Sequence, residues 1–223
     1  MPSEPLIELV DVTFAYKGRP PVLKGVNLKV EDGERVALVG SNGSGKTTTL
    51  SIIMGLIRPD SGAVKIFGEP RVRERDFQKA RPRMGFVFQD ADDQLFCPTV
   101  ADDIAFGPLN MGLGRREAAR VVDEVLERLD IKNFRDRITH DLSGGEKRLV
   151  ALGTALALKP RMLILDEPTT YLDRKVSARL VKILNELMLP LLIVSHDKDF
   201  LTDVGCRYLV MEDGRVEESA AFF

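Results

Sequence analysis

Apolar and polar residues alternate along the first part of the chain. This pattern predicts two β-strands, over residues 6–16 and 22–30, joined by a turn at 17–21. A short apolar run at 35–39 leads into a glycine-rich loop and a helix-like segment, and strand-like sequence returns at 63–67. The beginning of the chain is therefore expected to fold as three strands, a helix and a fourth strand.

The second half of the chain places helices between strands that are apolar throughout. Residues 162–165 and 191–194 are uninterrupted apolar runs, which is the pattern of strands buried on both faces of a parallel sheet. A further short strand is expected at 85–88. Amphipathic spacing predicts helices over 116–129, 144–158 and 176–188. Strands that alternate with helices predict an α/β fold, in which the helical middle of the chain, about 92–158, is an insertion.

Two charged stretches offer alternative interpretations. Residues 71–83 carry six basic and two acidic residues, which is typical of a solvated connector, with a phosphate-binding patch as the alternative. The five aspartates within 90–103 are expected to cap helices and turns, because they accompany helix-start signals, and not to bind a metal ion. His140 is expected to be structural or solvated, so the sequence offers no histidine-based transition-metal site.

Composition narrows the classes of function. A chain of 223 residues fits one large domain or one domain with a subdomain. The net charge of -2 argues against a general nucleic-acid binder, which carries a basic excess. The two cysteines lie far apart and fit a reducing cytosol. No apolar run approaches the ~20 residues of a membrane-spanning helix, so a role at a membrane requires a partner there.

A glycine-rich loop follows the strand at 35–39. Its glycines let the backbone curl so that several N–H groups face one anion, and the following helix adds a partial positive charge. Lys46 is placed to contact the β- and γ-phosphates of a nucleotide, and Thr47 to ligate Mg²⁺. An ordinary glycine turn is the alternative. The expected nucleotide-binding residues, which include the pattern G-x-x-x-x-G-K-[ST], are Gly40, Ser41, Asn42, Gly43, Ser44, Gly45, Lys46, Thr47 and Thr48.

Two acids end the apolar run at 162–165. A buried parallel strand delivers the side chains at its carboxyl end to the edge of the sheet where ligands bind. Asp166 is therefore expected to hold Mg²⁺, through water, and Glu167 to orient or deprotonate an attacking water molecule. The alternative, a strand that ends in solvated acids, is less consistent with a phosphate loop upstream.

A second glycine motif begins the helix predicted at 144–158. Ser143 and Glu146 have the spacing of a capping box, which is a sufficient structural explanation for both. Gly144 and Gly145 are not explained by a cap, because each costs about 1 kcal/mol relative to alanine in a helix. We therefore expect that they expose backbone N–H groups to an approaching phosphate.

With these motifs in place, the sequence resembles an ABC-type ATPase over about residues 6–216. The stretch 142–146 is similar to the signature motif of that family. The resemblance implies a P-loop NTPase fold with a parallel sheet, an antiparallel β subdomain and an inserted helical subdomain, in one domain with its core at 6–91 and 159–216. It also implies ATP hydrolysis with Mg²⁺. Its further residues would be Tyr16 stacking on adenine, Gln89 contacting γ-phosphate and Mg²⁺, Asp173 in the D-loop and His196 contacting γ-phosphate.

The middle of the chain resembles a narrower group within the ABC-type ATPases. Residues 88–96 and 105–110 resemble the energy-coupling-factor and cobalt or nickel importer ATPases. This resemblance implies uptake of transition-metal ions or vitamins, a head-to-tail dimer, transmembrane partner subunits and a peripheral location on the cytoplasmic face of the membrane. In such a dimer Ser143, Gly144 and Gly145 would contact the ATP held by the other subunit.

Several alternatives remain open from the residues. Tyr16 is also explained as a strand aromatic, and Gln89 as a solvated turn residue. The apolar stretch 95–98, with Phe106 and Met111, is either subdomain core or a groove for a helix of a membrane subunit. Glu146, Tyr171 and Arg174 depart from the commonest family residues, and the chain stops at Phe223 where many relatives continue. An ATPase of another transporter type, a soluble ABC protein acting on ribosomes or DNA, and a nucleotide-binding regulator are the competing classes.

Overall fold

The computed structural model describes residues 4–219 and divides them into two compact units. One unit contains residues 4–82 and 189–219, and the other contains residues 83–188. Among the described residues, no helix combines the length and apolarity needed to cross a membrane. The division into a core and a helical subdomain at 92–158 stays a prediction.

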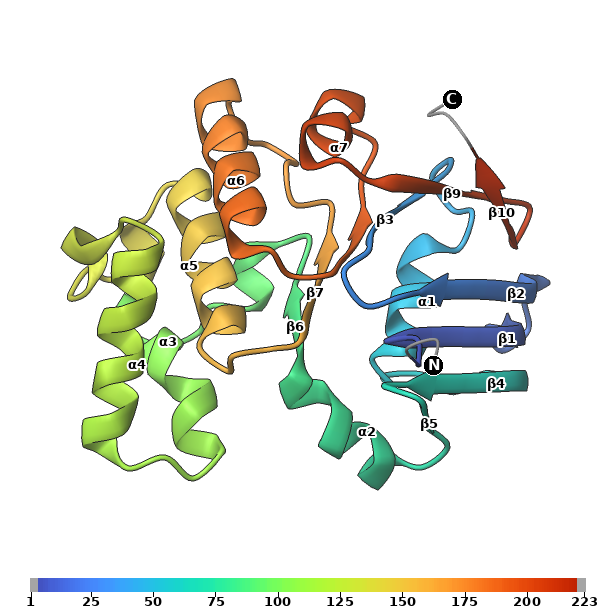
Figure 1. Cartoon of the computed structure of the whole chain (residues 1–223), viewed down its shortest axis with the longest axis horizontal. Helices are drawn as coiled ribbons and strands as arrows, with labels where there is room; N and C mark the ends of the chain where they lie inside the picture. Colours follow the sequence, from blue (N-terminus) through green and yellow to red (C-terminus); the bar gives the residue numbers. More distant parts are fainter. Residues whose placement is uncertain (1–3, 220–223) are drawn as a thin grey trace. The chain divides into compact units, whose positions relative to one another are not determined.

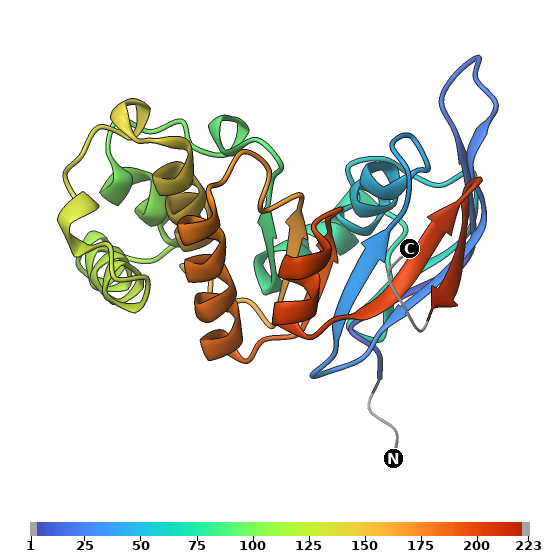
Figure 2. The same ribbon diagram turned by 90° about the horizontal axis from the view of Figure 1, so that it is seen from above.

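The first unit contains two groups of strands. One is an antiparallel sheet in the order β2-β1-β4-β5, and the other pairs β3 in parallel with β8 and β9, while β10 adds antiparallel to β9. Strand β10 also contacts β2, as both ribbon views show (Figures 1 and 2). The strands are β1 (Ile7–Ala15), β2 (Pro21–Val30), β3 (Arg35–Val39), β4 (Ser61–Ile66), β5 (Glu69–Pro70), β8 (Leu191–Val194), β9 (Arg207–Glu212) and β10 (Arg215–Ser219).

Three helices complete this unit, and the last two of them were not expected from the sequence. They are α1 (Lys46–Ile53), α2 (Glu74–Ala80) and α7 (Lys198–Val204). The interpretation of residues 71–83 as a solvated connector is wrong in part. Residues 72–75, 78 and 79 are exposed, but Phe77 and Ala80 of α2 are buried. Arg71 is also buried. Its guanidinium donates to the carbonyl oxygen of Ile66 at 2.8 Å and pairs with Glu69 at 2.9 Å.

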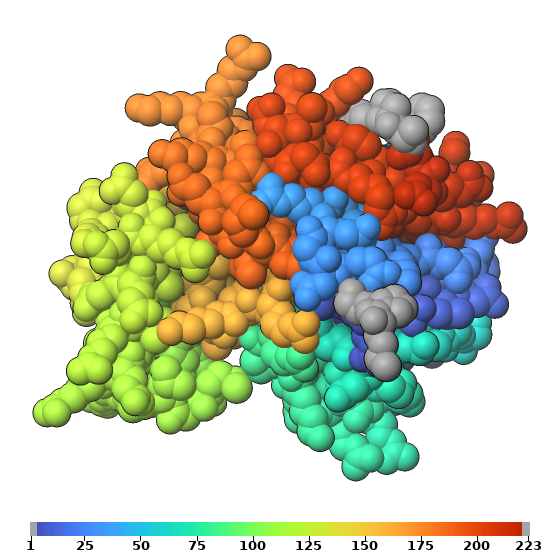
Figure 3. Space-filling model, viewed as in Figure 1, coloured from blue at the N-terminus to red at the C-terminus, as the bar shows by residue number. Residues whose placement is uncertain are grey.

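The second unit is a pair of parallel strands with four helices. Strand β7 is buried along its whole length and pairs with β6 in the register Val87 to Leu165. Helices α3, α4 and α5 contact one another (Figure 1), and Figure 3 shows in green to yellow-green the surface around α3 and α4. The elements are β6 (Met84–Val87), α3 (Val100–Asn110), α4 (Arg115–Arg128), α5 (Gly144–Leu156), β7 (Met162–Asp166) and α6 (Arg174–Leu187).

The buried faces of the helices in the second unit follow the predicted spacing. The side chains of Val121, Val122, Val125 and Leu126 on α4 are all buried, as helical periodicity requires. Two of the aspartates at 90–103 act as predicted. Asp90 accepts from the backbone N–H of Asp92, and the buried carboxylate of Asp103 accepts from the N–H of Cys97 at 2.9 Å.

Candidate active site

The phosphate loop joins the end of β3 to the start of α1. Its glycines have positive φ values, 151° at Gly40, 81° at Gly43 and 114° at Gly45. A side chain at Gly40 would collide with the carbonyl oxygen of Met211 on β9, and one at Gly45 would lie 2.8 Å from the side chain of Leu23. Only glycine combines these φ values with such close packing. Ser41, Asn42 and Gly43 form the exposed part of the loop.

Lys46 lies buried beneath this loop. Its ammonium donates to the carbonyl oxygens of Gly40, at 2.7 Å, and Ser41, at 2.9 Å. The Oγ of Ser44 is buried without a hydrogen-bond partner among the described residues. Helix α1 has no acid in its first turn, so the positive end of its dipole is not offset. A buried cation, an unsatisfied hydroxyl and a helix N-terminus together suit a polyphosphate anion.

Tyr16 lies directly after β1 and reaches α1. Its hydroxyl is 3.2 Å from Oγ1 of Thr48, and its ring meets that of Phe14 edge-on with centroids 4.9 Å apart. These two contacts hold the ring in place while a large part of it stays exposed. The exposed ring has the form of a stacking platform, and its contact with adenine stays a prediction.

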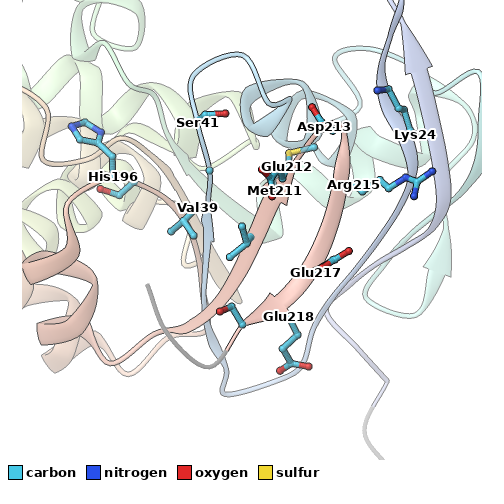
Figure 4. A pocket seen from close by; sticks show the side chains of 14 residues that line it. Lys24, Val39, Ser41, His196, Met211, Glu212, Asp213, Arg215, Glu217 and Glu218 are labelled. Carbon is cyan, nitrogen blue, oxygen red and sulfur yellow. The ribbon is translucent and has the colours of Figure 1, made fainter. Parts of the chain in front are cut away.

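His196 lies beside the phosphate loop although 155 residues separate it from Ser41 (196 − 41). Strands β3 and β8 run parallel with Leu38 opposite Val194, so both deliver their next residues to the same edge of the sheet. A hollow of about 1140 Å³ is lined by Gly40, Ser41 and His196, together with residues of β9 and β10. Figure 4 shows His196 and Ser41 at this hollow. The first unit therefore brings His196, a predicted γ-phosphate contact, to the same hollow as two residues of the predicted phosphate loop.

The second unit brings the predicted acids close to the predicted glutamine. Asp166 ends β7 and is buried, as is Glu167 after it. Because Val87 lies opposite Leu165 in the parallel pair, Gln89 and Glu167 follow adjacent strand ends. Glu167 has a φ of 44°, an unusual value for a residue other than glycine, which is typical of functional sites. Within residues 4–219, no cluster of three or more histidine, cysteine or acidic side chains is arranged to bind a metal ion.

The capping box at the start of α5 is confirmed. The backbone N–H and the hydroxyl of Ser143 both donate to the carboxylate of Glu146 at 2.8 Å. Arg137 donates to the same carboxylate at 2.5 Å, and this contact, followed by the bond from Ser143, lowers the pKa of Glu146 to about 2. Glu146 is therefore ionised at neutral pH, and it holds the hydroxyl of Ser143 in a fixed direction.

The two glycines of this motif have different surroundings. A side chain at Gly144 would meet nothing within 4 Å, whereas one at Gly145 would lie 3.0 Å from Val176 on α6. Gly145 thus allows α5 and α6 to pack closely, and Gly144 leaves an open backbone surface. Asp173 caps α6 by accepting from the N–H of Val176 at 2.9 Å. Contacts of these residues across a dimer stay predictions.

Comparison with known proteins identifies the family. A family model described as "ABC transporter" matches residues 23–170. The chain belongs to the ABC transporter family. An energy-coupling factor transporter ATP-binding protein, EcfA of Methanothermobacter thermautotrophicus, is 42% identical over 215 residues, which cover 95% of this chain and 69% of that protein.

Two solved structures show that the fold is that of the ABC ATPases. The structure of cbiO1 from Clostridium perfringens, part of the ABC transporter complex cbiONQ, matches with a TM-score of 0.88 at 34% identity, over 96% of this chain and 87% of that one. A dimeric ATP-binding cassette, MJ0796 bound to ADP and Pi, matches with a TM-score of 0.86 at 29% identity, over 97% and 100% of the two chains. The ABC protein described here is accordingly an ATP-binding ATPase of the transporter type.

The apolar stretch that begins at residue 95 divides between core and surface. Leu95 is 4% exposed and belongs to the core, so its interpretation as part of a docking groove is wrong. Phe96 is 63% exposed and meets the exposed Phe106 edge-on, with ring centroids 4.8 Å apart. Met111, at the end of α3, is exposed as well. Two neighbouring apolar residues thus point in opposite directions, which their hydrophobicity alone does not reveal.

Two polar residues of the ABC fold were missed in the sequence. Arg148 on α5 is buried and contacts the backbone that follows β6. Gln94 contacts the same helix, by donating to the carbonyl oxygen of Ala151 at 2.9 Å. The available signal was a basic residue, Arg148, directly before the segment 149–158, which contains no charged residue. That signal does not say which loop the arginine meets.

Proposed function

We propose that this chain is the ATP-hydrolysing subunit of an importer for transition-metal ions, cobalt or nickel, or for a vitamin. The observation that carries the proposal is its similarity, over almost its whole length, to an energy-coupling-factor ATPase and to cbiO1. In this role it lies on the cytoplasmic face of the membrane, held there by transmembrane partner subunits. The alternatives are an ATPase subunit of another ABC transporter type and a soluble ABC ATPase outside transport.

Each residue of the nucleotide site has a proposed task. Lys46 and the loop N–H groups bind the β- and γ-phosphates, and Tyr16 stacks on adenine. Glu167 activates the attacking water, while Gln89 and His196 respond to the γ-phosphate. Mg²⁺, when bound, neutralises phosphate charge. Its oxygen ligands would be Thr47, Gln89 and, through water, Asp166, which are the hard donors that this ion prefers.

The open surface at Gly144 supports a site shared between two copies of the chain. A side chain there would disturb nothing in its own subunit, so the glycine is not required for packing. We propose a head-to-tail homodimer in which Ser143, Gly144 and Gly145 contact the γ-phosphate of ATP on the partner. ATP then favours the closed dimer and hydrolysis favours its opening, since the two halves are bridged only while the γ-phosphate is present.

Mixing two inactive variants is expected to restore activity. Gly144→Asp places an acid in the first turn of α5, where its own helix tolerates it but an approaching phosphate does not. Lys46→Ala disables the phosphate loop instead. At a 1:1 ratio, about a quarter of wild-type ATPase activity should return, because half of the dimers then contain one site built from two intact halves. Each variant is first assayed alone, and a mixture no more active than either one would contradict the shared site.

The exposed pair Phe96 and Phe106 is proposed as the contact for the membrane subunits. Phe96→Asp is expected to weaken that contact by about 1.5–3 kcal/mol, through the loss of apolar burial. ATP binding by the isolated protein should be unchanged. The control is Val72→Asp, which also replaces an exposed apolar side chain with an acid but lies in the first unit. Co-purification of membrane subunits with the Phe96 variant at wild-type yield would exclude this surface as the contact.

The proposed transport role is tested with the complete complex. The chain is purified with whatever membrane proteins accompany it, and the complex is reconstituted in vesicles with ATP on the side of the ATPase. ATP-dependent uptake of cobalt, nickel or a vitamin is expected, together with its loss in Glu167→Gln. Uptake of an unrelated solute, export, or the absence of any membrane partner would each favour one of the alternatives.

A further inference from the structure

A buried arginine joins α5 to the segment that carries Gln89. The side chain of Arg148 is among the most buried charged groups of the described residues, with 4% of the residue exposed. Its Nη1 donates to the carbonyl oxygen of Phe88 at 2.5 Å, and its Nη2 donates to that of Gln89 at 2.6 Å. One guanidinium therefore holds two consecutive carbonyl groups, and both lie directly after β6.

Further side chains hold the same segment against α5. Lys147 pairs with Asp92 at 2.6 Å. The Nε2 of Gln94 donates to the carbonyl oxygen of Ala151, and its Oε1 accepts from the N–H of Phe88 at 3.1 Å. Residues 88–94 are thus attached to α5 at several points, and among the described residues the hydrogen bond from Arg148 is the one that reaches Gln89 itself.

The charge of Arg148 fits this position. Burial lowers the pKa of Arg148, and the nearby carboxylates of Asp90 and Asp166 oppose that change. A buried cation is tolerated only where hydrogen bonds and opposite charge offset its lost hydration. Lysine offers a single point of charge and cannot reproduce the planar pair of donors that meets two carbonyl groups.

We infer that Arg148 is a positioning residue for ATP hydrolysis, which holds the backbone of Gln89 so that the Gln89 amide faces the nucleotide. The inference rests on the role proposed above for Gln89.

The test begins with three variants in the full-length protein. Arg148→Met keeps the unbranched apolar part of the side chain but removes both donors. It is expected to lower kcat by about 10- to 100-fold, because the backbone of Gln89 is then no longer held in place. Arg148→Lys should recover part of that loss. Affinity for ADP should change less than twofold in both, because the phosphate loop is built elsewhere. Lys147→Met, which removes the neighbouring ion pair, is the control and should keep nearly wild-type kcat.

A double-mutant cycle with Gln89→Ala separates positioning from general stability. If Arg148 acts through Gln89, the double variant with Arg148→Met and Gln89→Ala should have a kcat less than about twofold below that of Gln89→Ala alone. If the loss of kcat in the double variant equals the product of the two single losses, the inference on Arg148 is overturned and Gln89 keeps its proposed role. An unchanged kcat in Gln89→Ala alone would overturn both the inference on Arg148 and the proposed role of Gln89. Thermal unfolding is measured for every variant, and if Arg148→Met does not fold, Arg148→Lys completes the same cycle.

Discussion

Replacing Glu167 with glutamine is expected to lower ATP turnover by about two to four orders of magnitude, the range attributed to a general base. Glutamine keeps the size of the side chain but lacks the charge that attracts the proton of an attacking water. The nucleotide contacts proposed for the phosphate loop are unaffected, so ATP should still bind. Because the γ-phosphate then persists, the variant should accumulate as an ATP-bound dimer.

Two measurements check this expectation. Phosphate release gives kcat, and size-exclusion chromatography with Mg-ATP gives the fraction of dimer. Glu186→Gln makes the same chemical change at an exposed site on α6, where Glu186 pairs with Lys182 at 3.8 Å, and it should behave as wild type. Normal turnover by a monomeric Glu167→Gln protein would remove Glu167 from the proposed mechanism.

Replacing Lys46 with alanine is expected to have a comparably large effect on binding. The ammonium is buried beneath the loop, and its hydrogen bonds to the carbonyl groups of Gly40 and Ser41 place its charge at the anion site. A charge-assisted hydrogen bond contributes about 1.5–3 kcal/mol, so ATP affinity should fall by at least ~10- to 100-fold.

Calorimetric titration of ATP into the variant measures this loss. Lys65→Ala removes an exposed lysine of β4 that pairs with Glu8 of β1, and it should leave the affinity for ATP unchanged. Thermal unfolding without nucleotide shows whether the loop still folds once its internal cation is gone. A folded Lys46→Ala protein with wild-type affinity would mean that the nucleotide binds elsewhere.

The strands buried on both faces were the best predicted elements. Residues 35–39 and 191–194 were predicted with the bounds that the structure has, because a fully buried strand reads as an apolar run wherever it lies. The short helix α2 was missed, since only Phe77 and Ala80 distinguish it from a charged linker. A seven-residue helix shows too little periodicity to be recognised.

The amino-acid sequence by itself determined the buried strands, the phosphate loop and the ABC family, because each depends on residues close together in the chain. Only the tertiary structure decided that His196 shares a hollow with Ser41, that Leu95 is core while Phe96 is exposed, and that Arg148 holds the backbone of Gln89. These contacts join residues up to 155 positions apart (196 − 41). They arise from how strands and helices pack, and local hydrophobic spacing carries no record of which distant backbone group a buried side chain will meet.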